Sequence, residues 1–122
     1  MPPCVRPDCR PVADPRILSR LEAAIARRRA ADDAQSYVAA LHRRGLPVIA
    51  RKLGEEAVET VVAALSGSHE ETVGEAADLI FHLLILLSAR EVPFDAVLNE
   101  LARREGVSGL EEKAMRSERD AD

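Results

Sequence analysis

Two long apolar segments joined by a very short connection constrain the fold of this chain more than any other feature. Residues 47–66 and 68–90 carry aliphatic side chains at helical spacing, and they meet in a Ser-Gly-Ser stretch. Pro47 suits the first turn of the first helix, and Ser68 with Glu71 forms a capping box for the second. Because so short a connection folds consecutive helices back on each other, the sequence predicts an antiparallel helical hairpin as the core.

Each helix of the predicted hairpin carries two acidic residues three positions apart. These are Glu56 and Glu59 on the first helix, and Glu75 and Asp78 on the second. Side chains at this spacing project from one face about a turn apart, so each pair can hold a cation between its members. An antiparallel hairpin brings the two pairs face to face, where four carboxylates repel unless a metal neutralises them. The sequence therefore predicts a metal site made by these four residues.

The predicted ligands are all hard oxygen donors, and this selects the kind of metal. Carboxylate and water ligands suit hard cations such as Mg²⁺ or Mn²⁺, whereas zinc favours nitrogen and sulfur. Magnesium usually keeps several positions for water and for substrate phosphates. We therefore expect a substrate that carries phosphate groups.

Three further polar residues lie near the predicted acidic stripe, and each has more than one interpretation. Glu55 lies further round its helix and is a ligand, a neighbour of the ligands, a base for water, or simply exposed. Lys52 either contacts a phosphate or forms a salt bridge with Glu56. His82 lies one turn beyond the acidic pair, and a buried, hydrogen-bonded histidine is a more common role at such a position than ligand or base.

Composition supports an all-α fold and excludes some partners. Apolar residues make up 47% of the chain and aromatic residues only 2%. The core must therefore come from aliphatic side chains, which is typical of packed helices more than of sheets. The formal net charge of −4 gives no basic footprint for nucleic acid.

The rest of the chain reads as one domain between two short ends. Residues 1–13 contain four prolines and are expected to be an irregular arm, residues 14–116 the all-α domain, and residues 117–122 a frayed tail. Further helices are predicted over about 15–31, 37–44, 93–105 and from Ser108 to Met115, with Asp14, Ser36 and Ser108 as N-terminal caps.

Neither the cysteines nor the apolar runs point outside the cytoplasm. Cys4 and Cys9 lie in the proline-rich arm, where a disulfide would close only a small loop and the ligands for a zinc site are missing. No apolar signal-peptide core is visible in the first 15 residues. The longest apolar run, Leu79–Leu87, is shorter than the roughly 20 residues that a membrane span needs. We therefore expect a soluble cytoplasmic protein that binds no membrane.

Several motifs of this chain resemble a known enzyme family. The carboxylate pairs resemble the all-α, MazG-like nucleoside-triphosphate pyrophosphohydrolases, and four stretches together resemble the phosphoribosyl-ATP pyrophosphohydrolases of histidine biosynthesis. The similarity covers about residues 16–116. The stretches are Ser36-Tyr37-Val38-Ala39-Ala40-Leu41, Arg51-Lys52-Leu53-Gly54-Glu55-Glu56, Ala77-Asp78-Leu79-Ile80-Phe81-His82-Leu83-Leu84 and Gly109-Leu110-Glu111-Glu112-Lys113.

The resemblance implies a reaction, a cofactor and an assembly. It implies Mg²⁺-dependent hydrolysis of 1-(5-phosphoribosyl)-ATP to 1-(5-phosphoribosyl)-AMP and pyrophosphate, by a homodimer whose long helices complete the bundle across the interface. It assigns the metal to the four carboxylates Glu56, Glu59, Glu75 and Asp78, with Glu55 beside them. Arg51, Val38 and Phe81 replace residues that are common in the family, which affects expected substrate contacts more than metal binding.

Other functions fit parts of the pattern. One is an enzyme of the same superfamily that clears non-standard nucleotides, and another is a helical dimerisation module without chemistry. A di-iron carboxylate bundle fits less well, because it needs Glu-x-x-His motifs where this chain has Glu-x-x-Asp. A comparison of turnover rates for phosphoribosyl-ATP and for free nucleotides distinguishes the expected enzyme from the nucleotide-clearing one. Stoichiometric binding of Mg²⁺ or Mn²⁺ would exclude the dimerisation module without chemistry.

Overall fold

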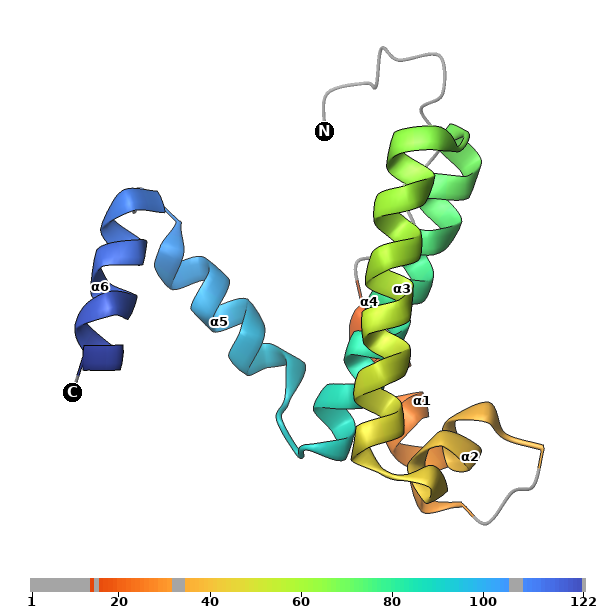
Figure 1. Ribbon diagram of the computed structural model, residues 1–122. Coiled ribbons are helices and arrows are strands. Elements are labelled where there is room, and N and C mark those ends of the chain that lie inside the picture. Colours follow the sequence, from red (N-terminus) through yellow and green to blue (C-terminus); the bar gives the residue numbers. More distant parts are fainter. Residues whose placement is uncertain (1–13, 15, 32–34, 106–108, 122) are drawn as a thin grey trace.

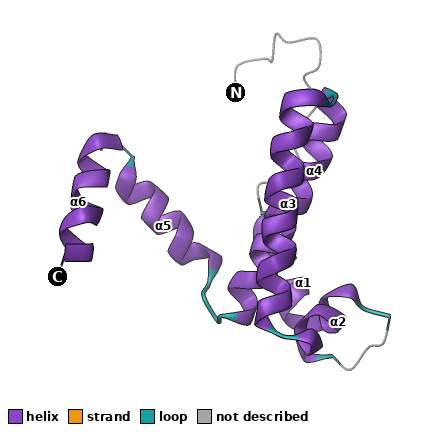
Figure 2. Cartoon of the chain, in the orientation of Figure 1, coloured by secondary structure: helices purple, strands orange, loops and turns teal. Residues whose placement is uncertain are grey.

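The protein is all-α, as the sequence predicts. A computed structural model describes residues 14, 16–31, 35–105 and 109–121, so Cys4, Cys9 and the whole N-terminal arm lie outside the described residues. No strand occurs in the part of the chain that the structure describes (Figure 2). The helices are α1 (Ile17–Ala30), α2 (Tyr37–Arg44), α3 (Leu46–Ser66), α4 (His69–Ala89), α5 (Phe94–Arg104) and α6 (Gly109–Ala121).

A long antiparallel hairpin of α3 and α4 is the main structural unit of the molecule (Figure 1). Each helix of the hairpin begins directly after a capping residue. Gly45, which ends α2 and caps α3, has a φ of 98°, a conformation that side-chain-bearing residues rarely adopt. Ser68 caps α4 by accepting a hydrogen bond from the Glu71 N–H at 3.1 Å. The predicted core helices, 47–66 and 68–90, therefore match α3 and α4 to within one residue at each end.

Two threonines bond across the hairpin and set its register. The Thr72 hydroxyl lies 3.2 Å from the Ala63 carbonyl oxygen, near the turn. Further along, the Thr60 hydroxyl oxygen lies 2.7 Å from the Glu56 carbonyl oxygen and 3.1 Å from that of Glu75. These contacts hold the segments around Glu56 and Glu75 side by side.

The hydrophobic core lies at one end of the hairpin, where α1 and α2 cover it. We call this end the base; it is the end at which α2 leads into α3 and α4 ends (Figure 1). Partly buried side chains, among them Leu18, Leu21 and Phe94, surround the core. Its fully buried members come from α1, α2, α3 and α4 and are Ile25, Val38, Leu41, Ile49, Leu84 and Ile85.

Polar contacts fasten α1 to the end of α4 and to the start of α5. The Glu22 carboxylate accepts a hydrogen bond from the Phe94 N–H at 2.7 Å. The Arg29 guanidinium donates to the Ser88 carbonyl oxygen. Both contacts link residues more than fifty positions apart, so they fix the base of the hairpin in a way that local sequence patterns do not reveal.

Helices α5 and α6 leave the base as an arm that runs away from the hairpin (Figure 1). No residue of α5 is buried, and Leu98 and Leu101 are exposed. Helix α6 continues to Ala121, so residues 117–121, for which the sequence predicted a frayed tail, are described as helix. The added residues include Glu118 and Arg119, whose unbranched side chains lose little freedom in a helix.

Helix α4 is the only described helix long and apolar enough, by length and composition, to cross a membrane. A core helix of a soluble protein passes the same test. Here the helix carries Glu75, Asp78 and a buried His82 among its apolar residues, and it packs along α3 over its length. Only 17% of its apolar window is buried within the protein, and its acidic residues Glu75 and Asp78 lie in the candidate site.

Candidate metal centre

Three of the predicted metal ligands meet halfway along the hairpin. Glu56 comes from α3, while Glu75 and Asp78 come from α4 one turn apart. One carboxylate oxygen from each lies within 4.8 Å of the others, which is close enough for a single cation to touch all three. The antiparallel packing predicted from the short connection therefore brings the two helices' acidic residues together.

Burial makes this cluster electrostatically unfavourable without a cation. Oε2 of Glu56 and Oε2 of Glu75 are both buried and have no hydrogen-bond partner among the described residues. Burial raises the pKa of both carboxyl groups, and the neighbouring Glu59 carboxylate raises them further. A hard cation bound between these two buried carboxylate oxygens would supply the partner that each of them lacks.

Glu59 lies at the edge of the cluster. It is exposed and falls outside the compact group of three, yet its carboxylate is close enough to raise the pKa of both Glu56 and Glu75. It also lines a hollow of about 290 Å³ between α3 and α4 that runs toward Gly67 and Glu71. The four predicted ligands are therefore neighbours, with Glu59 on the solvent side.

Lys52 and Glu55 pair with each other beside the cluster. The Lys52 ammonium lies 3.3 Å from the Glu55 carboxylate, whereas the sequence suggested a salt bridge to Glu56. The contact with Glu55 is the largest cause of a raised Lys52 pKa, followed by the nearby Tyr37, with Glu56 adding a smaller effect. Arg51 also lies 3.7 Å from Glu55. Glu55 is thus held by two cations on the outer side of α3, and not within the compact group.

His82 is a buried histidine with both ring nitrogens engaged. Its Nδ1 lies 2.7 Å from the Asp78 carbonyl oxygen, which can only accept, so Nδ1 carries a proton. Its Nε2 lies 2.8 Å from the Tyr37 hydroxyl. In the neutral ring Nε2 accepts this bond from the tyrosine. The structural role predicted as the more common one is therefore the role observed.

Two residues that position this site were missed from the sequence. Thr60 joins the backbones of Glu56 and Glu75, and Tyr37 orients His82 from a different helix. The spacing of Thr60, four residues after Glu56, could have indicated a bond to the helix backbone. Nothing in the sequence indicated that Tyr37 would reach a residue 45 positions away.

Fold and site together define a class of protein. It is an all-α protein built on a helical hairpin, with a carboxylate centre suited to a hard divalent cation and therefore to phosphate chemistry. The profile of the phosphoribosyl-ATP pyrophosphohydrolase family matches residues 18–105. The chain belongs to this family, which confirms the resemblance noted in its motifs.

Curated relatives are similar over most of their length. A phosphoribosyl-ATP pyrophosphatase of Novosphingobium aromaticivorans is 65% identical over 101 residues, which is 83% of this chain and 94% of the relative. One of Erythrobacter litoralis is 66% identical over 101 residues, covering 83% and 97%. One of Zymomonas mobilis is 54% identical over 99 residues, covering 81% and 92%. The family profile covers the chain from the start of α1 to the residue after α5, and α6 lies outside it.

Proposed function

We propose that this chain hydrolyses 1-(5-phosphoribosyl)-ATP to 1-(5-phosphoribosyl)-AMP and pyrophosphate, the second step of histidine biosynthesis, with Mg²⁺ as its metal. Family membership and the names of the relatives support the reaction. The observation that carries the proposal is the pair of buried, unpartnered carboxylate oxygens on Glu56 and Glu75. A polyphosphate would be repelled by such carboxylates alone, so a cation between them and the substrate is required.

The donor set fits a hard cation held by Glu56, Glu59, Glu75 and Asp78, and Mn²⁺ is the expected substitute for Mg²⁺. When bound, such a cation withdraws charge from the phosphates and lowers the pKa of a coordinated water. The protein's part is to keep the carboxylates in place. Thr60 does so through two backbone carbonyls and His82 through a third.

Glu55 and Lys52 are proposed to act on the water and on the phosphates. Glu55 would orient the attacking water and take its proton, while the electron pair of the broken P–O bond leaves with pyrophosphate. Lys52 is an ammonium ion at neutral pH, the form that binds phosphate, and the Glu55 carboxylate raises its pKa further. Their 3.3 Å contact, with Glu55 one residue before the proposed ligand Glu56 on α3, supports a joint role for both side chains.

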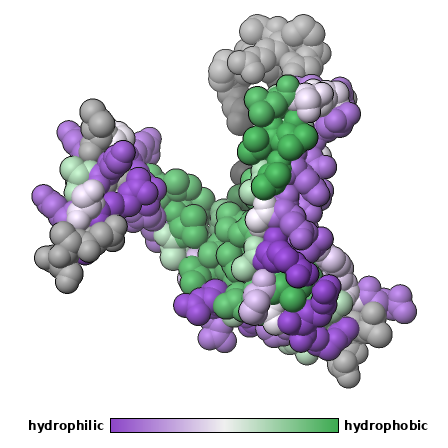
Figure 3. All heavy atoms as spheres, in the orientation of Figure 1, coloured by the Kyte–Doolittle hydropathy of each residue, from purple (hydrophilic) through white to green (hydrophobic). Residues whose placement is uncertain are grey.

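We further propose that the chain is a homodimer whose interface includes the free end of the hairpin. There Val58, Val61, Val62 and Leu65 of α3 are between 54% and 83% exposed, and Val73 of α4 is 57% exposed. Figure 3 shows hydrophobic residues gathered at this end of the hairpin and again along α5. Contiguous apolar patches are uncommon on monomers and usually mark an interface. A second copy presents the same patch, as a two-fold dimer requires.

The dimer is tested by sedimentation equilibrium of the wild type and of Leu65→Glu. We expect the wild type to sediment at twice the mass of one chain and the variant to dissociate, because a charge placed on a buried apolar contact is costly. Glu70→Gln, an exposed change at the same end of the hairpin, is the control and should stay dimeric. A monomeric wild type at micromolar concentration would refute the proposed dimer.

Pyrophosphate release from phosphoribosyl-ATP, measured with and without Mg²⁺ and beside a panel of free nucleotides, tests the proposed function. We expect turnover of phosphoribosyl-ATP that stops on chelation and returns with Mg²⁺. Preference for a free nucleotide such as dCTP or dUTP would favour the nucleotide-clearing alternative. Absence of both turnover and stoichiometric metal binding would favour the non-catalytic dimerisation module. We expect this activity in the cytoplasm, where a soluble biosynthetic enzyme would meet its substrate.

A further inference from the structure

A second hollow is lined by residues of α1, of the start of α2 and of α4. It encloses about 320 Å³, which is within the range of small-molecule sites. It combines one guanidinium, an amide, a hydroxyl and two aromatic rings, and no carboxylate lines it. The residues that line it are Arg28, Gln35, Ser36, Tyr37, Val38 and Phe81.

His82 connects this hollow to the carboxylate centre. The rings of Tyr37 and Phe81 meet the His82 imidazole edge-on, with centroids 5.7 and 5.8 Å away. The same imidazole bonds the Asp78 carbonyl oxygen at 2.7 Å. Phe81 follows Asp78 by three positions on α4, so the two side chains lie about one turn apart on neighbouring parts of the helix surface. A ligand that reaches the carboxylates can therefore extend into the hollow.

Charge distinguishes the hollow from the centre beside it. The centre is acidic, whereas the one charged side chain that lines the hollow is Arg28. Arg28 is exposed, and within the described part of the chain its guanidinium has no ion-pair partner. The Ser36 oxygen accepts a bond from the Ala39 N–H, which leaves its O–H available to donate. A guanidinium and a hydroxyl over aromatic rings suit a phosphorylated sugar.

We infer that this hollow binds the phosphoribosyl group of the substrate, with Arg28 on its 5′-phosphate and the sugar over Tyr37 and Phe81. The inference rests on the proposed function. It places the triphosphate at the carboxylate centre and Lys52, and the far end of the same molecule at Arg28. An ordinary nucleoside triphosphate lacks this second phosphate, so Arg28 is assigned as a specificity residue that separates phosphoribosyl-ATP from ATP.

Binding of the product without metal tests the hollow separately from catalysis. Phosphoribosyl-AMP keeps the phosphoribosyl group and lacks the pyrophosphate, and AMP lacks both. By calorimetry in EDTA, the wild type should bind phosphoribosyl-AMP about 10- to 100-fold more tightly than AMP, as expected for a charge-assisted contact. Arg28→Gln should remove most of this difference without changing AMP binding. Equal affinities for the two ligands in the wild type would overturn the inference.

Two variants of α1 control the experiment. Arg20→Gln removes the same charge from an exposed position two turns away and should bind phosphoribosyl-AMP as the wild type does. Arg28→Lys should recover only part of the affinity, because an ammonium cannot bind phosphate in a bidentate manner. If Arg20→Gln weakens binding as much as Arg28→Gln, the effect is one of overall charge and the assignment of Arg28 is wrong.

Kinetics separate a failure of this inference from a failure of the proposed function. For Arg28→Gln we expect KM for phosphoribosyl-ATP to rise about 10-fold or more while kcat stays within about 3-fold, since Arg28 lies away from the reacting phosphates. An active wild type with an unchanged KM in Arg28→Gln overturns the inference alone. A wild type that releases no pyrophosphate from phosphoribosyl-ATP overturns the proposed function, and the inference with it.

Discussion

The two ends of one hairpin use similar side chains in opposite ways. At the base, Ile49 of α3 and Leu84 of α4 are 1% and 2% exposed, because α1 and α2 cover them. At the free end, Leu65 and Val73 of the same helices are 83% and 57% exposed. In the sequence, apolar side chains recur at helical spacing at both ends of the hairpin. What differs is the presence of a covering element within the chain, and this is a property of the topology.

The carboxylate centre lies between these two ends. Glu56 and Glu75 are partly buried and lie within the middle turns of α3 and α4, between the aliphatic base and the exposed apolar end. Burial stabilises the base by removing apolar surface from water, and it raises the free energy of the ionised carboxylates in the middle. The base therefore provides the stability that allows the centre to be electrostatically unfavourable until a cation binds.

The largest effect is expected in the middle of the hairpin. Glu75→Gln keeps the shape of the side chain but removes a proposed ligand, so turnover should fall by at least about 100-fold, more than for a group that only supports a metal ligand. Pyrophosphate release under saturating Mg²⁺ measures the loss. Glu70→Gln, an exposed change on the same helix, should retain full activity. Full activity of Glu75→Gln would show that this carboxylate is no part of the site.

The same substitution should raise the stability of the metal-free protein. The Glu75 pKa is raised above its ordinary value, so the folded state favours the protonated form. The wild type in EDTA should therefore gain stability as the pH falls through the raised pKa, with the gain complete below the unfolded value of 4.5. Glu75→Gln should unfold at a higher temperature than wild type at pH 7.5 and gain less on acidification. A lower melting temperature would contradict the proposed repulsion.

A matched pair of leucines compares the ends directly. Leu84→Ala at the base should reduce the free energy of unfolding by about 2–5 kcal/mol, because it leaves a cavity in a packed core. Leu65→Ala removes the same atoms from an exposed position and should cost the protomer about 0.5 kcal/mol or less. Urea denaturation of both variants at several protein concentrations measures the difference. Equal losses already at the lowest protein concentration, where the chain is monomeric, would contradict the expected difference between the two ends.

The sequence was sufficient for the hairpin because its determinants are local. The capping serine before α4, the glycine before α3 and the short connection all act within a few residues. The hairpin also fixes which faces of α3 and α4 meet. The proximity of Glu56, Glu75 and Asp78 could therefore be predicted from the sequence alone. Spacing along two helices was enough to indicate a candidate metal centre.

Contacts between distant elements could not be predicted in the same way. Tyr37 meets His82 across 45 positions, and Glu22 meets the Phe94 N–H across 72. Helical spacing suggested Glu56, four residues on, as the ion-pair partner of Lys52, although Glu55, three residues on, lies on the same side of the helix. The side-chain conformation, which selects Glu55, depends on its surroundings. The hollow beside Tyr37 follows from the same long-range packing and has no local sequence signature.

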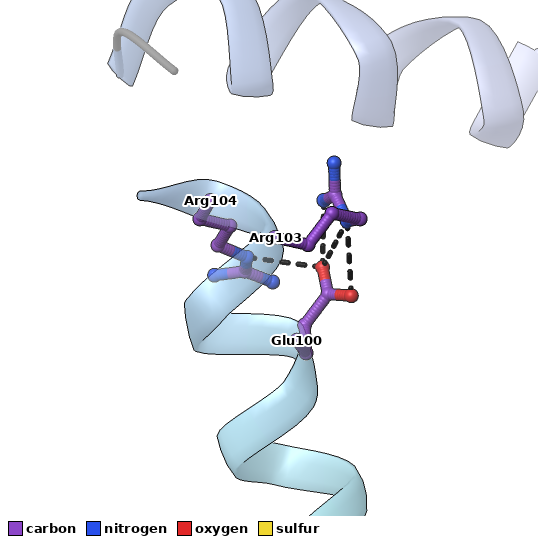
Figure 4. Close-up of polar contacts among 3 residues, drawn as sticks. All are labelled: Glu100, Arg103 and Arg104. Carbon is purple, nitrogen blue, oxygen red and sulfur yellow. Dashed lines mark hydrogen bonds and ion pairs between the residues drawn. The ribbon is translucent and has the colours of Figure 1, made fainter. Parts of the chain in front are cut away.

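The smallest effect is expected in the C-terminal arm formed by α5 and α6, which extends the comparison to a region without a buried core. On α5, Glu100 accepts hydrogen bonds from Arg103 and from Arg104, with nitrogen–oxygen distances between 2.7 and 3.2 Å (Figure 4). Arg103 is the larger cause of a Glu100 pKa lowered from 4.5 to about 2. These pairs are spaced three and four residues apart, so they act within one helix and need no packing from the rest of the fold.

A lowered pKa means that this contribution to stability is present above pH 4.5 and is lost as the pH falls toward about 2. The group is exposed, so its effect should be small and should weaken further in high salt. Carbon-13 NMR titration of the Glu100 carboxyl should show a midpoint near 2 in low salt. Arg103→Gln should raise this midpoint more than Arg104→Gln does. A wild-type midpoint at 4.5 would mean that local charge pairs do not hold the arm, and that its order depends on contacts with another chain.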